Sequence, residues 1–258
     1  MTMLSNREYL DIIYAQHSHK RAKDWNSGPA LEYWYHAAED SLGVTSEGNL
    51  LSAHGWTVTG TIAEVEGSGA DFMTSADKGT PNSLSTDTAG DIVQSPTIFG
   101  DYVHGLQVCL LTNRLSKTGA PDLPRFLELL VYFAFDAGND ETASGVGFVE
   151  DGGSPAVAND HMAAFFIDGT SFKLRSGAAT SGIIVAKDTA FHLGRILIDN
   201  INALAYGWLD DFSATPVSIA IQADEWPVSF GWGTHTSTGA NDPKVNFARV
   251  RYGWAGWF

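Results

Sequence analysis

Cysteine and long apolar runs are both scarce in this sequence, and each scarcity excludes a class of protein. Cys109 is the single cysteine, so the chain cannot form an internal disulfide framework. The longest apolar run, FLELLVYFAF, has about ten residues, whereas a membrane-spanning helix needs roughly 18–20. The first residues also lack the apolar stretch of a secretory signal. We therefore expect a soluble product that is made in a cytoplasm and has no membrane partner.

Basic residues are outnumbered two to one. The chain has 15 Lys and Arg against 30 Asp and Glu, which gives a formal net charge of −15 at pH 7. A surface of this sign repels phosphate backbones and anionic lipids, so we expect no nucleic-acid partner. The few basic residues include a cluster at Lys20, Arg21 and Lys23, and none follows until Lys78. The sequence thus indicates an acidic body with a short basic arm.

Turn-forming residues are abundant, which favours β-structure with many loops over a helical bundle. The sequence has 27 Gly, and its acids are 20 Asp against 10 Glu. Asp favours turns, whereas Glu favours helices. From about residue 50 the apolar positions alternate with a period of two, and turn signals separate the alternating segments. The expected strands are 57–65, 71–74, 105–113, 125–135, 163–167, 171–175, 183–187, 191–199, 203–209, 217–222, 228–232 and 244–252, with a loop at 78–91.

The first fifty residues follow a helical pattern instead. We expect one helix over residues 8–23 and a short second helix over residues 30–42. Short strands with no helices between them are typical of an antiparallel sandwich. We therefore predict an all-β, antiparallel jelly-roll β-sandwich over residues 50–258, preceded by a partly helical N-terminal arm over residues 1–49.

The order of the strand-like segments in the second half is similar to that of a known family. RFLELLVYFAF is followed by GVGFVED, MAAFFIDGTSFKLRSG, TAFHLGRILIDNINALAYGWLDD, SIAIQADE and NFARVRYGW. This order resembles the concanavalin A-like (LamG-like) jelly roll, which occurs in lectins, glycan-active enzymes and phage virion proteins. Segments 191–211 and 246–252 carry most of the resemblance, which covers about residues 50–258. It implies the sandwich fold and does not fix a function.

Motifs for catalysis are missing. The sequence has no G-x-S-x-G, no P-loop and no dinucleotide-binding glycine motif. It also lacks the E-x-D-x-x-E strand found in glycan hydrolases of the resembled fold. Glu128 stands alone in its strand, where we expect it to be partnered or to face an edge rather than to act as a general acid. His192, Arg195 and Tyr206 fall on neighbouring expected strands, but a period of two points His192 and Arg195 to opposite faces, which argues against a lyase site. We expect no catalytic residues.

Two parts of the chain suit docking on another protein. The first expected helix combines apolar residues with the basic cluster at its end. The chain ends in WAGWF, whereas chain termini are usually polar, so this aromatic tail suits a docked position. The residues expected to dock are Tyr9, Ile12, Ile13, Lys20, Arg21, Lys23, Trp254, Trp257 and Phe258.

Candidate ligand sites come from tryptophans and from acidic loops. Tryptophans in jelly rolls stack on sugar rings, although they also fill sandwich cores. Oxygen-rich loops suit a structural Ca²⁺, although Asp and Asn are also simple turn formers. The candidate glycan-binding residues are Trp208, Trp226 and Trp232, and the candidate calcium ligands are Asp136, Asn139, Asp140 and Asp199.

Three functions compete. The leading hypothesis is a non-enzymatic structural virion protein, a bacteriophage capsid decoration (cement) protein that docks on the major capsid protein as a homotrimer at the outer capsid surface. A sandwich without catalytic acids, a basic arm and an aromatic tail all suit that role, and acidity suits a position away from packaged DNA. The alternative is a glycan-binding, lectin-like or receptor-binding module. The second alternative is a glycan hydrolase or lyase.

Overall fold

The computed structural model describes residues 31–36, 56–60, 62–65, 83–86, 90–95, 126–136, 144–150, 152–199, 202–221, 228–235 and 242–253. Over these ranges the chain is almost entirely β-structure, with one short 3₁₀ turn, η1, at Ala158–Asp160. None of these ranges contains a helix with the length and apolarity needed to cross a bilayer. The strands form two sheets, and every strand pairing within them is antiparallel.

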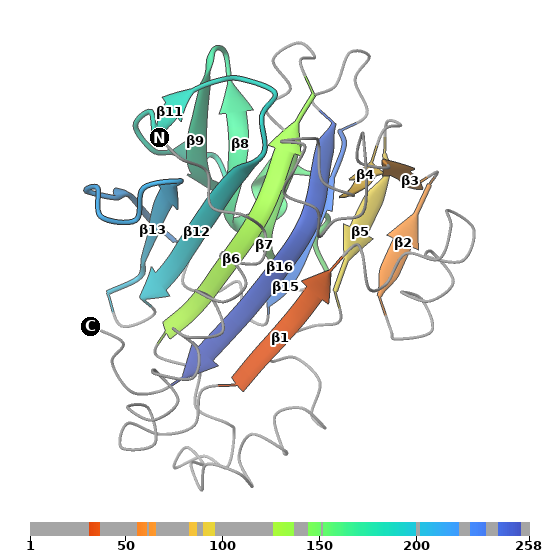
Figure 1. Ribbon diagram of the computed structural model, residues 1–258. Helices are drawn as coiled ribbons and strands as arrows, with labels where there is room; N and C mark the ends of the chain where they lie inside the picture. The colour runs from red at the N-terminus through yellow and green to blue at the C-terminus, as the bar shows by residue number, and fades with distance from the viewer. Residues whose placement is uncertain are drawn as a thin grey trace, which may run out of the picture.

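Sheet A contains the longest strands, and Figure 1 shows β12, β6, β16 and β1 side by side across one layer. Both β1 and β4 pair with the same edge of β16, at different positions along it. The order across the sheet is β14 (Val217–Ala220), β13 (Leu204–Leu209), β12 (His192–Asp199), β6 (Phe126–Phe135), β16 (Pro243–Gly253), β4 (Ser83–Thr86) and β3 (Ile62–Val65), with β1 (Leu31–His36) beside β16.

Sheet B forms the second layer. Its strand order is β10 (Ala179–Thr180), β9 (Ser171–Ser176), β8 (His161–Asp168), β7 (Gly145–Glu150), β15 (Val228–Gly233), β5 (Ile92–Gln94) and β2 (Thr57–Thr59), with β11 (Val185–Ala186) also beside β9. The turn between β8 and β9 is the one that Asp-Gly-Thr predicts, and Gly169 at its centre has a φ of 64°.

Alternate residues of the long strands fill the space between the sheets, as a period of two requires. Phe133 of sheet A stacks on Phe165 of sheet B, with ring centroids 5.3 Å apart. Each large side chain buried in this way stabilises the fold by roughly 1.5–3 kcal/mol. In β6 the inward-facing residues, none of which exposes any surface, are Leu127, Leu129, Val131, Phe133 and Phe135.

The structure corrects three expectations. The helix predicted over 30–42 is wrong over Leu31–His36, which is strand β1 of sheet A; three aromatic residues in six favour a strand, and β16 supplies the partner. The arm assigned to residues 1–49 thus contributes a strand to the sandwich. The loop predicted over 78–91 contains β4. The single strand predicted over 57–65 is two, β2 and β3, which belong to different sheets.

The other expected elements either lie outside the described residues or agree with the structure. The helix at 8–23 and the strands at 71–74 and 105–113 lie outside the described residues. Over the second half, each expected strand from 125–135 to 244–252 has its counterpart. The all-β sandwich is therefore confirmed, and the arm remains a prediction apart from β1.

Four glycines lie in a square on the face of sheet B that points away from the core. In the pairing of β7 with β15, Gly147 is opposite Gly231 and Gly145 is opposite Gly233. The segment 152–160 lies against this square: a Cβ at Gly231 would lie 3.2 Å from Pro155, and one at Gly233 would lie 2.9 Å from the Ala156 nitrogen. Because these glycines have no side chains, the segment can pack close to the backbone of the sheet. The segment then leads directly into β8 at His161.

Gly147→Ala is expected to lower the free energy of unfolding by about 1–3 kcal/mol, because added volume in a well-packed site forces the backbone to shift. The new Cβ would lie 2.3 Å from the carbonyl oxygen of Ala163, which is backbone and cannot rotate away. Urea denaturation measures the change. Gly182→Ala is the matched control, because nothing lies within 4 Å of its Cβ position. Equal stability of the two variants would contradict the close approach at Gly147.

Candidate functional site

A hollow of about 300 Å³ opens beside β13, on the face of sheet A that points away from sheet B. We call this face the outer face of sheet A. Among the described residues the hollow is lined by Asp199, Tyr206, Trp208 and Pro216. Its volume is at the lower end of the range for small-molecule sites. The mixture of two aromatic rings, a proline and a carboxylate suits a ligand that has both apolar and polar surfaces.

The strand period and the strand register bring these side chains together. Tyr206 and Trp208 are two residues apart on β13, so they point to the same side. Asp199 ends the neighbouring strand β12, where it is paired with Leu204. Pro216 directly precedes β14, which pairs with the other edge of β13. The hollow is therefore formed by neighbouring strands of the sheet, together with Pro216 at the end of the connection between β13 and β14.

The indole of Trp208 is held in place from several sides. Its Nε1–H donates a hydrogen bond to the carbonyl oxygen of Ala214 at 3.0 Å. The guanidinium carbon of Arg195 lies 5.0 Å from the centre of the indole ring, within cation–π range. The ring of Tyr206 is tilted by 37° to it, with centroids 6.4 Å apart. A ligand would meet an aromatic surface that is already positioned, which lowers the entropy lost on binding.

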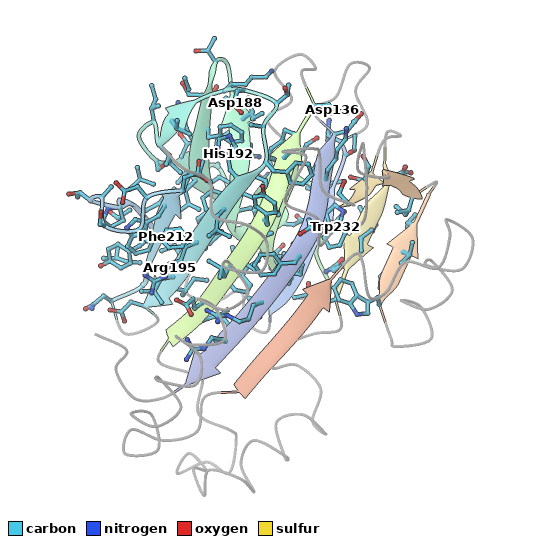
Figure 2. The ribbon with its side chains drawn as sticks, viewed as in Figure 1. Asp136, Asp188, His192, Arg195, Phe212 and Trp232 are labelled. Atoms are coloured by element: carbon cyan, nitrogen blue, oxygen red, sulfur yellow. The ribbon has the colours of Figure 1, made fainter. Side chains whose placement is uncertain are left out.

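The loop over residues 210–216 supplies both Ala214 and Pro216, and it is anchored at its start. Phe212 packs on the apolar cluster of the outer face, beside Tyr132 and Leu193. Asp210, which has a φ of 60°, accepts hydrogen bonds from the Leu193 nitrogen at 2.9 Å and from His192 at 2.6 Å. Figure 2 shows Phe212 and Arg195 on the same side of the sandwich.

His192 lies between two carboxylates. Its Nδ1 is 2.6 Å from Asp210 and its Nε2 is 2.9 Å from Asp188, which Figure 2 shows beside it. Burial alone would lower the pKa of His192, but the hydrogen bonds and charges of Asp210 and Asp188 outweigh burial, and the pKa is raised. Both ring nitrogens of His192 are therefore engaged by carboxylates, and among the described residues neither contacts a hydroxyl or thiol that could act as a nucleophile.

The predicted separation of His192 and Arg195 is confirmed. His192 is buried and its ring contacts Phe172 of sheet B at 4.9 Å, so it faces the core. Arg195 lies on the outer face, opposite Trp208 in the register. Arg195 and Tyr206 therefore share a face that His192 does not.

Glu128 is the shared carboxylate of three arginines on the outer face. Its Oε1 accepts a hydrogen bond from Arg195 Nε at 2.8 Å, and its Oε2 lies 3.5 Å from Arg251 Nη1 and 3.7 Å from Arg249 Nη2. Its side chain is only 4% exposed. The prediction that Glu128 is partnered is confirmed. The network runs from the buried middle of the outer face to Arg195 beside the hollow, where the side chain is 22% exposed.

The three candidate sugar-binding tryptophans have different outcomes. Trp208 lines the hollow and is half-buried. Trp232 is in the core with no exposed surface, packed against Trp56 and Phe230, and Figure 2 shows it within the sandwich. The prediction that Trp232 stacks on a sugar is therefore wrong, since no ligand reaches it. Trp226 lies outside the described residues.

The candidate calcium ligands are bound to protein groups where the structure describes them. Asp136 forms an ion pair with Lys244 at 2.6 Å. Asp199 accepts hydrogen bonds from the side-chain and backbone nitrogens of Asn202, at 2.6 and 3.3 Å, and so stabilises the turn that follows β12. These two aspartates are at opposite ends of sheet A, since Asp199 pairs with the first residue of β6 and Asp136 follows its last. Within the described ranges no three His, Cys, Asp or Glu side chains converge as metal ligands.

Several predicted sites stay untested. Asn139 and Asp140, together with every residue expected to dock on a partner (Tyr9, Ile12, Ile13, Lys20, Arg21, Lys23, Trp254, Trp257 and Phe258), lie outside the described residues.

Pro216 carries no functional signal in the sequence, and Tyr206 and Arg195 were predicted only as parts of a rejected lyase site. Alternation within Tyr206-Gly-Trp208 was a usable signal, because it places two aromatic rings on one face. Arg195 carries no such signal in its own strand. Its position beside Trp208 follows from the pairing of β12 with β13.

No family model matches the chain, and no curated protein matches it. Solved structures do. Peanut lectin, in a structure with a nine-residue peptide, covers 87% of this chain and 97% of its own, with a TM-score of 0.54 and 8% identity. The conserved carbohydrate esterase of the Shiga toxin-encoding bacteriophage phi24B covers 87% of this chain and 100% of its own, with a TM-score of 0.51 and 13% identity. These likenesses show the fold: the chain is a concanavalin A-like jelly roll, as its sequence predicted.

Proposed function

We propose that this chain is a carbohydrate-binding protein without enzyme activity, and that a sugar ring binds in the hollow beside Trp208. The observation that carries the proposal is a fixed indole paired with Tyr206 in an open hollow of a lectin-like sandwich. Aromatic faces take up the apolar C–H face of a sugar ring, while Asp199 and Arg195 lie within reach of its hydroxyls. The two similar structures described above are a lectin and a carbohydrate esterase.

Trp208→Ala is expected to weaken glycan binding at least about tenfold, because aromatic anchors at the centre of a site carry most of its binding energy. A glycan array identifies a ligand for the native protein, and titration calorimetry then gives the affinities. Trp208→Phe is the matched variant: it retains an aromatic face, loses only the bond to Ala214, and should keep most of the affinity. Unchanged affinity in Trp208→Ala, with a thermal midpoint close to native, would rule out this hollow as the site.

The absence of activity is the second part of the proposal. A carbohydrate esterase needs a nucleophile with an adjacent base, and His192, on the strand next to that of Trp208, has both nitrogens engaged by carboxylates and faces the core. Assays for ester cleavage, reducing sugars and unsaturated uronates on mixed polysaccharides should all be silent. If protein purified to homogeneity still cleaves one of these substrates, the chain is an enzyme and the proposal of a purely binding role is wrong.

A second candidate function is capsid decoration: a structural protein at the outer surface of a bacteriophage capsid, docked on the major capsid protein as a homotrimer. The similarity to a bacteriophage protein favours this context, and a surface position is compatible with glycan binding. Co-sedimentation with phage particles tests it, and absence of the protein from particles would reject it. A structural Ca²⁺ at the loop after Asp136 stays a prediction in either case.

A further inference from the structure

We infer that the hollow takes an acidic sugar, a ring that carries a carboxylate such as a uronic acid, and that Arg195 provides the selectivity. This inference rests on the proposed function and names its ligand class. Arg195 lies beside Trp208 in the register of β12 and β13. A carboxylate on a ring placed against Trp208 would therefore come next to a guanidinium.

Arg195 is held in a position that leaves its terminal nitrogens available. Its Nε–H donates to Glu128, and its guanidinium plane lies near the Trp208 ring. In the part of the chain that the structure describes, the Nη1 and Nη2 groups of Arg195 have no hydrogen-bond acceptor, and the side chain reaches solvent. A guanidinium fixed through Nε presents both Nη groups in the fork geometry that a carboxylate accepts.

Positive charge gathers on the outer face around one carboxylate. Arg195, Arg251 and Arg249 have nitrogens 2.8, 3.5 and 3.7 Å from Glu128. Asp199, which lines the hollow, adds one negative charge there, on a chain whose total charge is −15. Screening limits the long-range repulsion, because the Debye length is about 8 Å at physiological ionic strength.

The acids closest to the hollow are already engaged by local donors. Asp199 is bound by Asn202. Asp210 is bound by His192 and the Leu193 nitrogen. Asp211 accepts from the Ser213 hydroxyl and nitrogen, and these bonds lower the pKa of Asp211. Each of these carboxylates accepts hydrogen bonds from protein donors, and Arg195 is the positively charged side chain that lies next to the indole, 5.0 Å from its centre.

The experiment compares one ligand with and without its charge. Oligogalacturonide and the same oligosaccharide after reduction of its carboxyls to alcohols are titrated into the native protein, and oligoglucuronide is treated in parallel. We expect the acidic form of at least one pair to bind at least about tenfold more tightly. Arg195→Gln should bring that ratio close to one while the reduced form binds as before. Arg195→Lys, which keeps the charge but not the fork, should retain part of the preference.

The outcomes separate this inference from the proposed function. Equal or tighter binding of the reduced form would overturn the acidic ligand and leave carbohydrate binding intact. No binding of any sugar, acidic or neutral, across a glycan array would overturn both. If Arg195→Gln melts far below the native protein, salt titration of the native protein decides: the preference for the acidic form should shrink as ionic strength rises, and a preference independent of salt would count against Arg195.

Discussion

Acidification from pH 6.5 to pH 5 is expected to lower the free energy of unfolding by about 2 kcal/mol through His161 alone. Burial lowers the pKa of His161 from 6.5 to about 3; the charge of Arg175 acts in the same direction, and a hydrogen bond to the Pro155 carbonyl opposes it. Its Nε2 is 2.9 Å from that carbonyl, and its Nδ1 has no hydrogen-bond partner among the described residues. The ring is therefore held neutral in the folded protein.

The sign follows from which state takes the proton. Below pH 6.5 the unfolded chain protonates this histidine while the folded protein does not, so stability falls as the pH falls, by about 1.4 kcal/mol per pH unit until the folded pKa is approached. Above pH 6.5 both states are neutral, and the stabilisation is fully present. The window of this effect is therefore pH 6.5 down to about 3.

Urea denaturation of the native protein and of His161→Gln at pH 7.5, 6.5, 5.8 and 5 gives the free energy of unfolding as a function of pH. The contribution of His161 is the difference between the two slopes, which does not depend on how much the substitution lowers stability at a single pH. His192→Gln is the matched control of opposite sign. The pKa of His192 is raised, so its stabilisation is present below pH 6.5 and is lost as the pH rises through the raised value. A slope for His161→Gln equal to the native slope between pH 6.5 and 5 would show that this ring is not held neutral.

Glu128→Gln is expected to lower the free energy of unfolding by about 3–5 kcal/mol, the usual cost of removing one partner from a buried ion network. The amide keeps the size of the side chain but removes the negative charge that Arg195, Arg249 and Arg251 share. Two of these arginines are themselves buried, with side chains 9% and 3% exposed, so water cannot replace the lost partner.

Asp168→Asn is the control for Glu128→Gln. It removes the charge from a 2.6 Å pair with Lys173 in which the carboxylate is 40% exposed, and exposed pairs contribute about 0–1 kcal/mol. Chemical denaturation at pH 7 compares the two variants. Losses of similar size would mean that the network around Glu128 is hydrated and contributes no more than a surface pair.

The sequence predicted the architecture well where period-two patterning and turn residues agree. The strand FLELLVYFAF alternates residues that face the core with residues of the outer face, as a period of two requires, and Asp168-Gly169-Thr170 forms the turn that joins β8 to β9. The error at Leu31–His36 has a physical cause: its aromatic residues favour a strand only where a partner strand is available, and that partner, β16, is more than 200 positions further along the chain. The local sequence of a strand carries no signal that identifies a partner strand so far along the chain.

The site was predictable only in part for the same reason. Trp208 and Trp232 are both in strands and both flanked by glycine, yet one lines a hollow and the other fills the core. Trp232 is on the face of its strand that points toward the other sheet, and Trp208 is on the face that points away from it. Which face of a strand points inward depends on the pairing of the strands. Arg195 and Glu128 are 67 positions apart, and their ion pair likewise depends on the pairing of β12 with β6.

The place of β16 in sheet A has a consequence for the order in which the chain folds. β16 pairs with β6 on one edge and with β1 and β4 on the other. During synthesis β1, β3 and β4 are made long before residues 243–253, so these early strands have no sheet A neighbour except each other until β16 leaves the ribosome. Closure of the sandwich is thus a late event with large loop-closure entropy, and this topology places the protein among slowly folding β-proteins.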